Sequence, residues 1–354
     1  MMKYYINGRF LTQRITGVQR YAREMTLALD QLLQEKPSDH SEYTILAPKN
    51  IIDRLPCKRI QFKVCGHLSG HLWEQIELPY YAKDGYLLNF CNCAPLIKKN
   101  QAVTIHDAAI AAFPSAYSWK FRLWYRIMYT VLGKRLNTIF TVSNFSRSEL
   151  NKYFGIPKEK IHVTYNGVEH LKAIQPDDRI LAKIPKDYVL AVSSQNPTKN
   201  FKLVLEAAEQ LPDIHFVIAG GSNAKVFNGK EKKALPNVQY VGYVSDQELV
   251  SLYRHAMVFV YPSLYEGFGI PPLEALLNGC PAIVSNQASL PEICGDRVDY
   301  CNLKNTKSLV SKIIDIALKK KPAIQHLEKR IQERYSWKKS SAYLYAYYND
   351  NRSK

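Results

Sequence analysis

Residues 256–285, AMVFVYPSLYEGFGIPPLEALLNGCPAIVS, decide the fold class of this chain. The apolar run at 257–261 predicts a buried strand, and a second apolar run ends the stretch. Between them, Gly267 and Gly269 form a loop, and the prolines at 271–272 open a helix at positions where a missing backbone N–H does no harm. Strand, glycine loop, helix and strand in this order predict a parallel βαβ unit.

The rest of the chain repeats this alternation, which is typical of parallel sheets covered by helices. We expect strands at 3–7, 42–47, 60–65, 86–90, 102–106, 138–142, 161–165, 188–193, 215–220, 238–243, 257–261 and 281–285. We expect helices at 17–34, 72–84, 118–136, 146–154, 199–210, 246–256, 271–278, 306–319 and 336–348. The polar segment 168–187 holds two prolines and breaks the rhythm, so we interpret it as a linker between two Rossmann-like domains.

Composition supports a folded two-domain protein with an anionic partner. The chain has 354 residues, 46% of them hydrophobic and 22% charged, as in ordinary globular proteins. The net charge of +17 suggests nucleic acid, a phosphorylated small molecule or an acidic membrane surface as the partner. The N-terminus has no secretory signal pattern and no run of about 18 apolar residues occurs, so we expect a cytoplasmic or peripheral membrane protein.

The seven cysteines are expected to be reduced thiols, since their number is odd and no secretory signal precedes them. Cys91 and Cys93 are the one close pair. No second pair and no histidine cluster is near them in the sequence, which argues against zinc. We therefore expect no zinc site at this pair.

The glycine loop carries two carboxylates, Glu266 and Glu274. A helix N-terminus suits a phosphate, and a carboxylate beside a diphosphate is repelled by it, so its natural partner is a ribose or hexose hydroxyl. The alternative is a loop charge and a solvated helix face. The stretch is not the dinucleotide fingerprint, because the third glycine is missing.

Glu266-x7-Glu274, within YEGFGIPPLEALLNGCPAIVSN, resembles the signature of the retaining glycosyltransferases of the GT-B fold, in family four. The resemblance implies an α/β protein with two Rossmann-like domains facing a central cleft. It implies that Glu266 is catalytic, near the transferred sugar, and that Glu274 binds the donor ribose. The donor would also contact Gly267, Phe268, Gly269 and Ile270.

The segment SSQNPTKNFKLVLEA (193–207) is similar to the phosphate-binding segment of that family. Lys199, followed by Asn200, matches the donor-binding lysine, and a lysine is a sensible point charge on a diphosphate. The second basic residue of many relatives is missing, and Lys202 is a candidate to replace it. The plain alternative is an exposed lysine at a helix start.

Two segments of the first half resemble the donor-facing edge of the same family. Gly17, in TGVQRYAREM (16–25), would approach the donor phosphates, and His106, in VTIHDAAI (103–110), would reach the donor sugar as a catalytic residue. The alternatives are an ordinary turn before an amphipathic helix and a packed or capping histidine. Asn89 matches a strand end that faces the same cleft.

Residues 118–136, SWKFRLWYRIMYTVLGKRL, mix aromatic and basic side chains. A basic amphipathic helix suits an anionic membrane surface. The alternative is a domain helix whose basic residues face solvent. Since relatives of the resembled family act on lipid-linked or lipopolysaccharide acceptors, we expect peripheral contact with the inner face of the cell membrane.

The resemblance thus implies an acceptor-binding domain at 1–170 and a nucleotide-sugar donor domain at 171–354, whose last helix crosses back to the first domain. The implied activity is retaining transfer of a hexosyl group (mannose, fucose, rhamnose or similar) from a nucleoside diphosphate sugar to a glycan hydroxyl. The resemblance implies that this reaction needs no metal and no cofactor. The rival enzyme is a sugar nucleotide epimerase of the same fold. A nucleic-acid-binding protein is the remote alternative, and we expect no nucleic-acid partner because no recognisable module is present.

Overall fold

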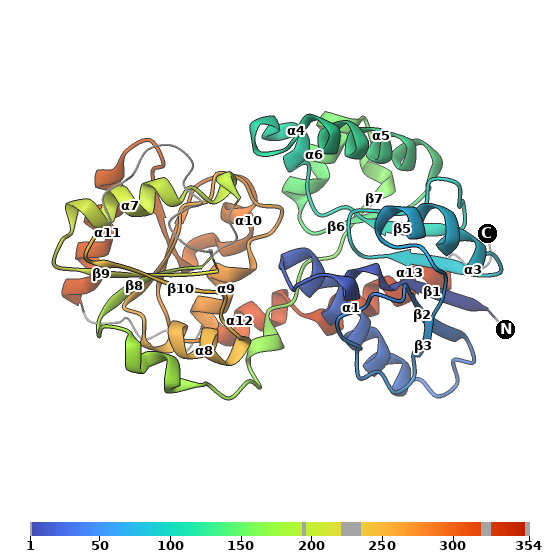
Figure 1. Ribbon diagram of the computed structural model, residues 1–354, viewed down its shortest axis with the longest axis horizontal. Helices are drawn as coiled ribbons and strands as arrows, with labels where there is room; N and C mark the ends of the chain where they lie inside the picture. Colours follow the sequence, from blue (N-terminus) through green and yellow to red (C-terminus); the bar gives the residue numbers. More distant parts are fainter. Residues whose placement is uncertain (1, 193–195, 221–234, 320–326, 351–354) are drawn as a thin grey trace. The chain divides into compact units, whose positions relative to one another are not determined.

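The computed structural model describes residues 2–192, 196–220, 235–319 and 327–350. The chain divides into two compact units (Figure 1). Unit 1 comprises Met1–Gly167 and Tyr335–Lys354, and unit 2 comprises Val168–Arg334. Each unit is built on its own parallel sheet.

The sheet of unit 1 has the strand order β3-β2-β1-β4-β5-β6-β7, with parallel pairing throughout. The strands are β1 (Lys3–Asn7), β2 (Glu42–Ala47), β3 (Gln61–Val64), β4 (Tyr86–Asn89), β5 (Gln101–Thr104), β6 (Ile139–Thr141) and β7 (Ile161–Val163). The helices are α1 (Gly17–Gln34), α2 (Gly70–Leu72), α3 (Leu78–Tyr81), α4 (Ala109–Ala112), α5 (Trp119–Arg135), α6 (Asn144–Phe154) and α13 (Trp337–Asp350), and a π-helical turn, η2 (Trp73–Glu77), joins α2 to α3.

The last helix of the chain belongs to unit 1. In Figure 1, α13 runs beside α1, and these two helices pack against each other. Tyr348 of α13 packs between Tyr4 of β1 and Tyr86 of β4, so this aromatic side chain is part of the core of unit 1.

The sheet of unit 2 has the order β10-β9-β8-β11-β12-β13, again parallel. The strands are β8 (Tyr188–Val192), β9 (His215–Ala219), β10 (Val238–Gly242), β11 (Val258–Tyr261), β12 (Ala282–Ser285) and β13 (Asp299–Cys301). The helices are α7 (Phe201–Gln210), α8 (Asp246–His255), α9 (Ile270–Leu277), α10 (Leu290–Cys294), α11 (Thr306–Lys319) and α12 (Leu327–Arg334). The two sheets confirm the predicted pair of Rossmann-like α/β folds.

Three expectations need correction. The segment 168–187 is not a free linker but part of unit 2, where a 3₁₀ helix (Asp178–Lys183) packs on α8 and Asp178 accepts a hydrogen bond from Ser251 at 2.7 Å. The helix expected at 72–84 runs over residues 70–81 and contains a π-helical turn in its middle. The strand β13 has only three residues and gave no apolar run, so it was missed.

Candidate active site

The strand order of unit 2 reverses between β8 and β11, which lie side by side although β9 and β10 separate them in sequence. Open parallel sheets bind ligands outside the carboxyl ends of the strands, at such a switch point. The chain leaves β8 toward Lys199 and leaves β11 toward Glu266. The two residues predicted from separate motifs therefore meet at one place.

Lys199 and Glu266 form an ion pair. The ammonium of Lys199 lies 2.6 Å from Oε1 of Glu266 and donates to the hydroxyl of Tyr261 at 2.9 Å. Ser263 Oγ donates to the same carboxylate oxygen at 2.5 Å. The side chains of the pair are 18% and 11% exposed, so both are largely but not fully buried. Burial and the charge of Glu266 raise the pKa of Tyr261, which keeps its hydroxyl protonated.

Gly269 holds the turn between the loop and α9. Its φ of +89° is a conformation that favours glycine, and a Cβ atom there would lie 2.5 Å from Cδ2 of Leu290. Ser289 Oγ also anchors the loop by donating to the carbonyl of Phe268 at 3.0 Å. The predicted donor-binding residues Gly267, Phe268, Gly269 and Ile270 are all buried in this turn.

Glu274 is buried on α9 with both carboxylate oxygens occupied. His170 Nε2 lies 2.8 Å from Oε1, and the hydroxyl of Tyr253 donates to Oε2 at 3.2 Å. Burial and the charge of Glu274 raise the pKa of Tyr253, which therefore stays a hydrogen-bond donor. The alternative of a solvated helix face is wrong for Glu274.

The residues around Lys199 have different surroundings. Asn200 adopts a left-handed conformation (φ 53°) and starts α7. Lys202 is 73% exposed and lies 3.5 Å from Glu206 on the outer side of α7, so its position gives no support to a phosphate role. The first three residues of the segment 193–207 lie outside the described residues.

The two predicted site residues of unit 1 differ in solvent exposure: Gly17 is exposed and His106 is buried. Gly17 opens α1, where Thr16 makes no side-chain capping bond and a Cβ on the glycine would meet nothing within 4 Å. His106 is buried two residues after β5, with Nε2 2.9 Å from the carbonyl of Phe90. Burial lowers the pKa of His106 to about 4, so the ring is neutral at pH 7 and donates from Nε2.

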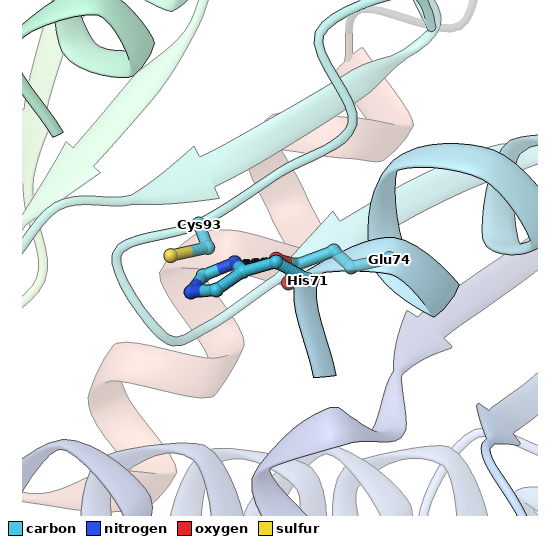
Figure 2. Close-up of side chains that lie close together, drawn as sticks. All are labelled: His71, Glu74 and Cys93. Atoms are coloured by element: carbon cyan, nitrogen blue, oxygen red, sulfur yellow. Dashed lines mark hydrogen bonds and ion pairs between the residues drawn. The ribbon is translucent and has the colours of Figure 1, made fainter. Parts of the chain in front are cut away.

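One cluster in unit 1 has metal-ligand chemistry (Figure 2). Ligand atoms of His71, Glu74 and Cys93 lie within 4.8 Å of one another, so the fold brings one histidine and one carboxylate to Cys93 that the sequence spacing does not show. However, Arg9 Nε lies 3.0 Å from Glu74 and its charge opposes a cation there. Burial raises the pKa of Cys93 to about 12, so its thiol is neutral. We interpret the cluster as a buried ion-pair network.

Sequence reasoning missed the residues that hold the two glutamates. Ser263 and Tyr261 flank the predicted loop, and their position at a strand end was a usable signal. His170 and Tyr253 come from segments far from the motif, and no local pattern marks them. Only the fold brings these four side chains to Glu266 and Glu274.

Two family models match separate parts of the chain. The model described as "Glycosyl transferases group 1" matches residues 176–335, and that described as "Glycosyltransferase Family 4" matches residues 87–170. Together they span the core of unit 2 and the second half of the sheet of unit 1.

Two curated relatives are similar in sequence. The O-antigen chain mannosyltransferase B of Escherichia coli is 34% identical over 217 residues, which cover 54% of this chain and 55% of the relative. The O-antigen chain mannosyltransferase RfbU of Salmonella typhimurium is 30% identical over 227 residues, covering 63% and 62%. The match thus spans less than two thirds of either relative.

Among solved structures, the sucrose-phosphate synthase of Thermosynechococcus elongatus has a similar fold. Its TM-score is 0.74 at 17% identity, with 99% of each chain covered. At this identity the likeness concerns the fold alone.

Proposed function

Since the chain belongs to the glycosyltransferases of group 1 and family 4, which share the GT-B fold, we propose that it transfers a hexosyl group from a nucleoside diphosphate sugar to a glycan hydroxyl. The acceptor is a lipid-linked or lipopolysaccharide-type glycan, and mannose is the first sugar to test because both curated relatives are named mannosyltransferases. Fucose and rhamnose are the next sugars to test. The observation that carries the proposal is the Lys199–Glu266 pair at the switch point of unit 2.

Lys199 supplies charge to the diphosphate. Its ammonium is held within hydrogen-bond distance of Glu266 and Tyr261, so it is already placed before the donor arrives. Charge that develops on the leaving diphosphate is stabilised best by such a preorganised group. The start of α9, at Ile270, adds the positive end of a helix dipole.

Glu274 binds the donor ribose. A carboxylate is a natural acceptor for two neighbouring hydroxyls, and this one is held by His170 and Tyr253 from the side of the protein. The ribose hydroxyls share its remaining lone pairs. Glu266, on the loop before α9, faces the transferred sugar.

The reaction proceeds with retention at the anomeric carbon. The bond from that carbon to the phosphate oxygen breaks, the acceptor oxygen bonds on the same face, and the leaving phosphate takes the acceptor proton. The chain needs no carboxylate nucleophile for this route. The one adjacent aspartate pair, Asp177 and Asp178, is committed to Arg179 and to Ser251, so it supports no metal-dependent scheme.

A donor screen tests the proposal. Nucleoside diphosphate sugars are added singly, and the unfolding temperature is measured. A true donor at 100 times its Kd stabilises the protein by about 2.7 kcal/mol. NMR of the product then reads its anomeric configuration, and inversion contradicts the mechanism. Conversion of the donor without any acceptor would instead identify an epimerase.

We further propose that unit 1 rests on an anionic membrane through α5. Its inner face packs Met128, Tyr129 and Leu132 into the core. The remainder of the helix, including its whole first turn, exposes four large apolar side chains and five basic ones. The basic side chains make no ion pair with any described residue. The exposed residues are Trp119, Phe121, Leu123, Ile127, Lys120, Arg122, Arg126, Lys134 and Arg135. A basic residue near an anionic leaflet contributes about 1 kcal/mol.

Vesicle cosedimentation tests this surface. We expect the protein to sediment with phosphatidylglycerol-containing vesicles and to be released by salt. Replacing Trp119, Leu123 and Ile127 by serine should lower binding about a hundredfold, since each apolar side chain contributes on the order of 1 kcal/mol or more. Leu318→Ser, which changes an exposed leucine of unit 2, is the matched control. Equal sedimentation of all three proteins would contradict the assignment. No helix among the described residues is long and apolar enough to cross a bilayer.

A further inference from the structure

Unit 1 has a switch point of its own, between β1 and β4. Asn7 ends β1 and Asn89 ends β4, and Asn7 Nδ2 donates to Asn89 Oδ1 at 3.0 Å. Parallel sheets of this order bind ligands at this position. The donor chemistry proposed above is centred on the switch point of unit 2, and it assigns no role to Asn7, Glu74 or His71.

A buried carboxylate organises this switch point. Glu74 lies on the π-helical turn with its side chain 1% exposed, and its Oε1 accepts hydrogen bonds from Asn7 at 2.8 Å and from Arg9 at 3.0 Å. Burial alone would raise the pKa of Glu74, but the hydrogen bonds from His71 and Asn7 and the charge of Arg9 together lower it. Glu74 is therefore a charged acceptor.

His71 is the member of this network that reaches the surface. Its side chain is 40% exposed, and its Nδ1 lies 3.2 Å from Oε2 of Glu74. Nδ1 faces the Glu74 carboxylate and carries a proton there, so in the neutral tautomer of the ring the other nitrogen, Nε2, is the hydrogen-bond acceptor. Nε2 has no hydrogen-bond partner among the described residues. In Figure 2 one ring nitrogen meets Glu74 and the other points away from it.

Aromatic side chains flank the imidazole. The ring centroids of Trp124 and Tyr125, both on α5, lie 5.8 and 6.3 Å from that of His71, at steep angles. Both side chains are half-buried. An oriented acceptor nitrogen beside aromatic surface is the chemistry that recognises a sugar, which offers hydroxyl donors and apolar C–H groups.

The backbone around the network is unusual as well. The turn that carries Glu74 is π-helical, a form that is rare and frequent at functional sites. Asn92, between the two nearby cysteines, has φ 60° although it is not a glycine. Its Oδ1 accepts the backbone N–H of His106 at 2.7 Å, which ties the loop after β4 to the end of β5.

We propose that His71 binds the acceptor glycan: its Nε2 accepts a hydrogen bond from an acceptor hydroxyl, and the sugar ring lies beside Trp124 and Tyr125. Glu74 is a positioning residue, which fixes the ring and its tautomer. This inference rests on the proposed transferase function and names the residues of its acceptor site.

Kinetics with surrogate acceptors test it. Octyl glycosides of the common hexoses serve as acceptors, and the slow hydrolysis of donor in their absence is measured in parallel. His71→Ala should raise the acceptor KM about tenfold, the effect of losing roughly 1.4 kcal/mol. Its donor hydrolysis should stay at the wild-type rate. His71→Gln, whose amide oxygen can accept the same hydroxyl, should recover most of the affinity. His67→Ala, which changes an exposed histidine outside the network, is the control.

The outcomes separate the two proposals. An unchanged acceptor KM in His71→Ala, with active wild-type enzyme, overturns the acceptor site and leaves the transferase intact. Loss of both donor hydrolysis and donor-induced stabilisation in the wild type overturns the transferase itself. The NMR signal of the His71 ring proton, assigned by its loss in His71→Gln, should shift with methyl glycosides. No shift with any of them refutes the site. One zinc bound per wild-type chain and absent from His71→Ala also refutes it, because the cluster is then a metal site.

Discussion

Replacing Lys199 by methionine keeps the length of the side chain and removes its ammonium group. The structure predicts two separate consequences. The variant loses the 2.6 Å ion pair with Glu266 and the 2.9 Å contact with Tyr261. It also loses the charge that the proposed mechanism places on the leaving diphosphate.

The stability cost should be small. Glu266 keeps its 2.5 Å hydrogen bond from Ser263 and is partly exposed to water, so its carboxylate still has hydrogen-bond partners after the substitution. We expect the free energy of unfolding to fall by about 1 kcal/mol, at the lower end of the range for a group that loses a partner. Urea unfolding of the variant and the wild type measures this difference in the free energy of unfolding.

The catalytic cost should be large. Loss of one preorganised group at a developing negative charge lowers kcat by about 100 to 1000-fold, or about 3 to 4 kcal/mol. Steady-state transfer with saturating acceptor gives kcat/KM for the donor. Lys202→Met is the control, since this lysine is 73% exposed and lies on the same stretch of chain. A folded Lys199→Met protein within about threefold of wild-type kcat/KM would refute the role of Lys199.

Three further predictions concern the glycines, a buried histidine and the ribose site. Gly269→Ala should destabilise the protein by about 1 to 3 kcal/mol, because the residue has a φ of +89° and its new Cβ would lie 2.5 Å from Cδ2 of Leu290. Gly17→Ala has open space around it, so it should leave thermal stability unchanged and lower only donor turnover. The pKa of His106 is lowered to about 4 in the folded state, so its contribution to stability is complete above the ordinary value near 6.5 and is lost as the pH falls toward 4. When the pH is lowered from 7 to 5, the free energy of unfolding, measured with urea, should fall by about 2 kcal/mol less in His106→Gln than in the wild type. An equal fall in both proteins would contradict the buried neutral ring. His170→Leu should raise the donor KM about tenfold with kcat nearly constant, because Glu274 loses the partner that orients it; a fall in kcat alone would argue against a ribose site.

The repeating architecture was predictable from the sequence because buried parallel strands are short apolar runs. The expected strands 3–7 and 42–47 and the expected helices 17–34 and 306–319 agree with β1, β2, α1 and α11. Their ends are marked by local chemistry such as glycine, proline and polar residues. The three-residue strand β13 carries no such signal.

The site was predictable only in part. The motif around Glu266 and the segment of Lys199 each gave a candidate, and strand order explains why they meet. The partners of Glu274 were not predictable, since His170 lies 104 positions away in sequence. The same is true of the network around His71, because its members come from four separate segments that only the switch point of unit 1 brings together.

The central claim is that the Lys199–Glu266 pair is the centre of a retaining hexosyl transfer. The most direct measurement is the transfer assay with the donor that stabilises the wild-type protein, carried out on wild type and on Glu266→Ala. The account predicts a wild-type product with the anomeric configuration of the donor, and no measurable product from a Glu266→Ala protein whose unfolding remains cooperative. Transfer by Glu266→Ala at a rate near that of the wild type would contradict it.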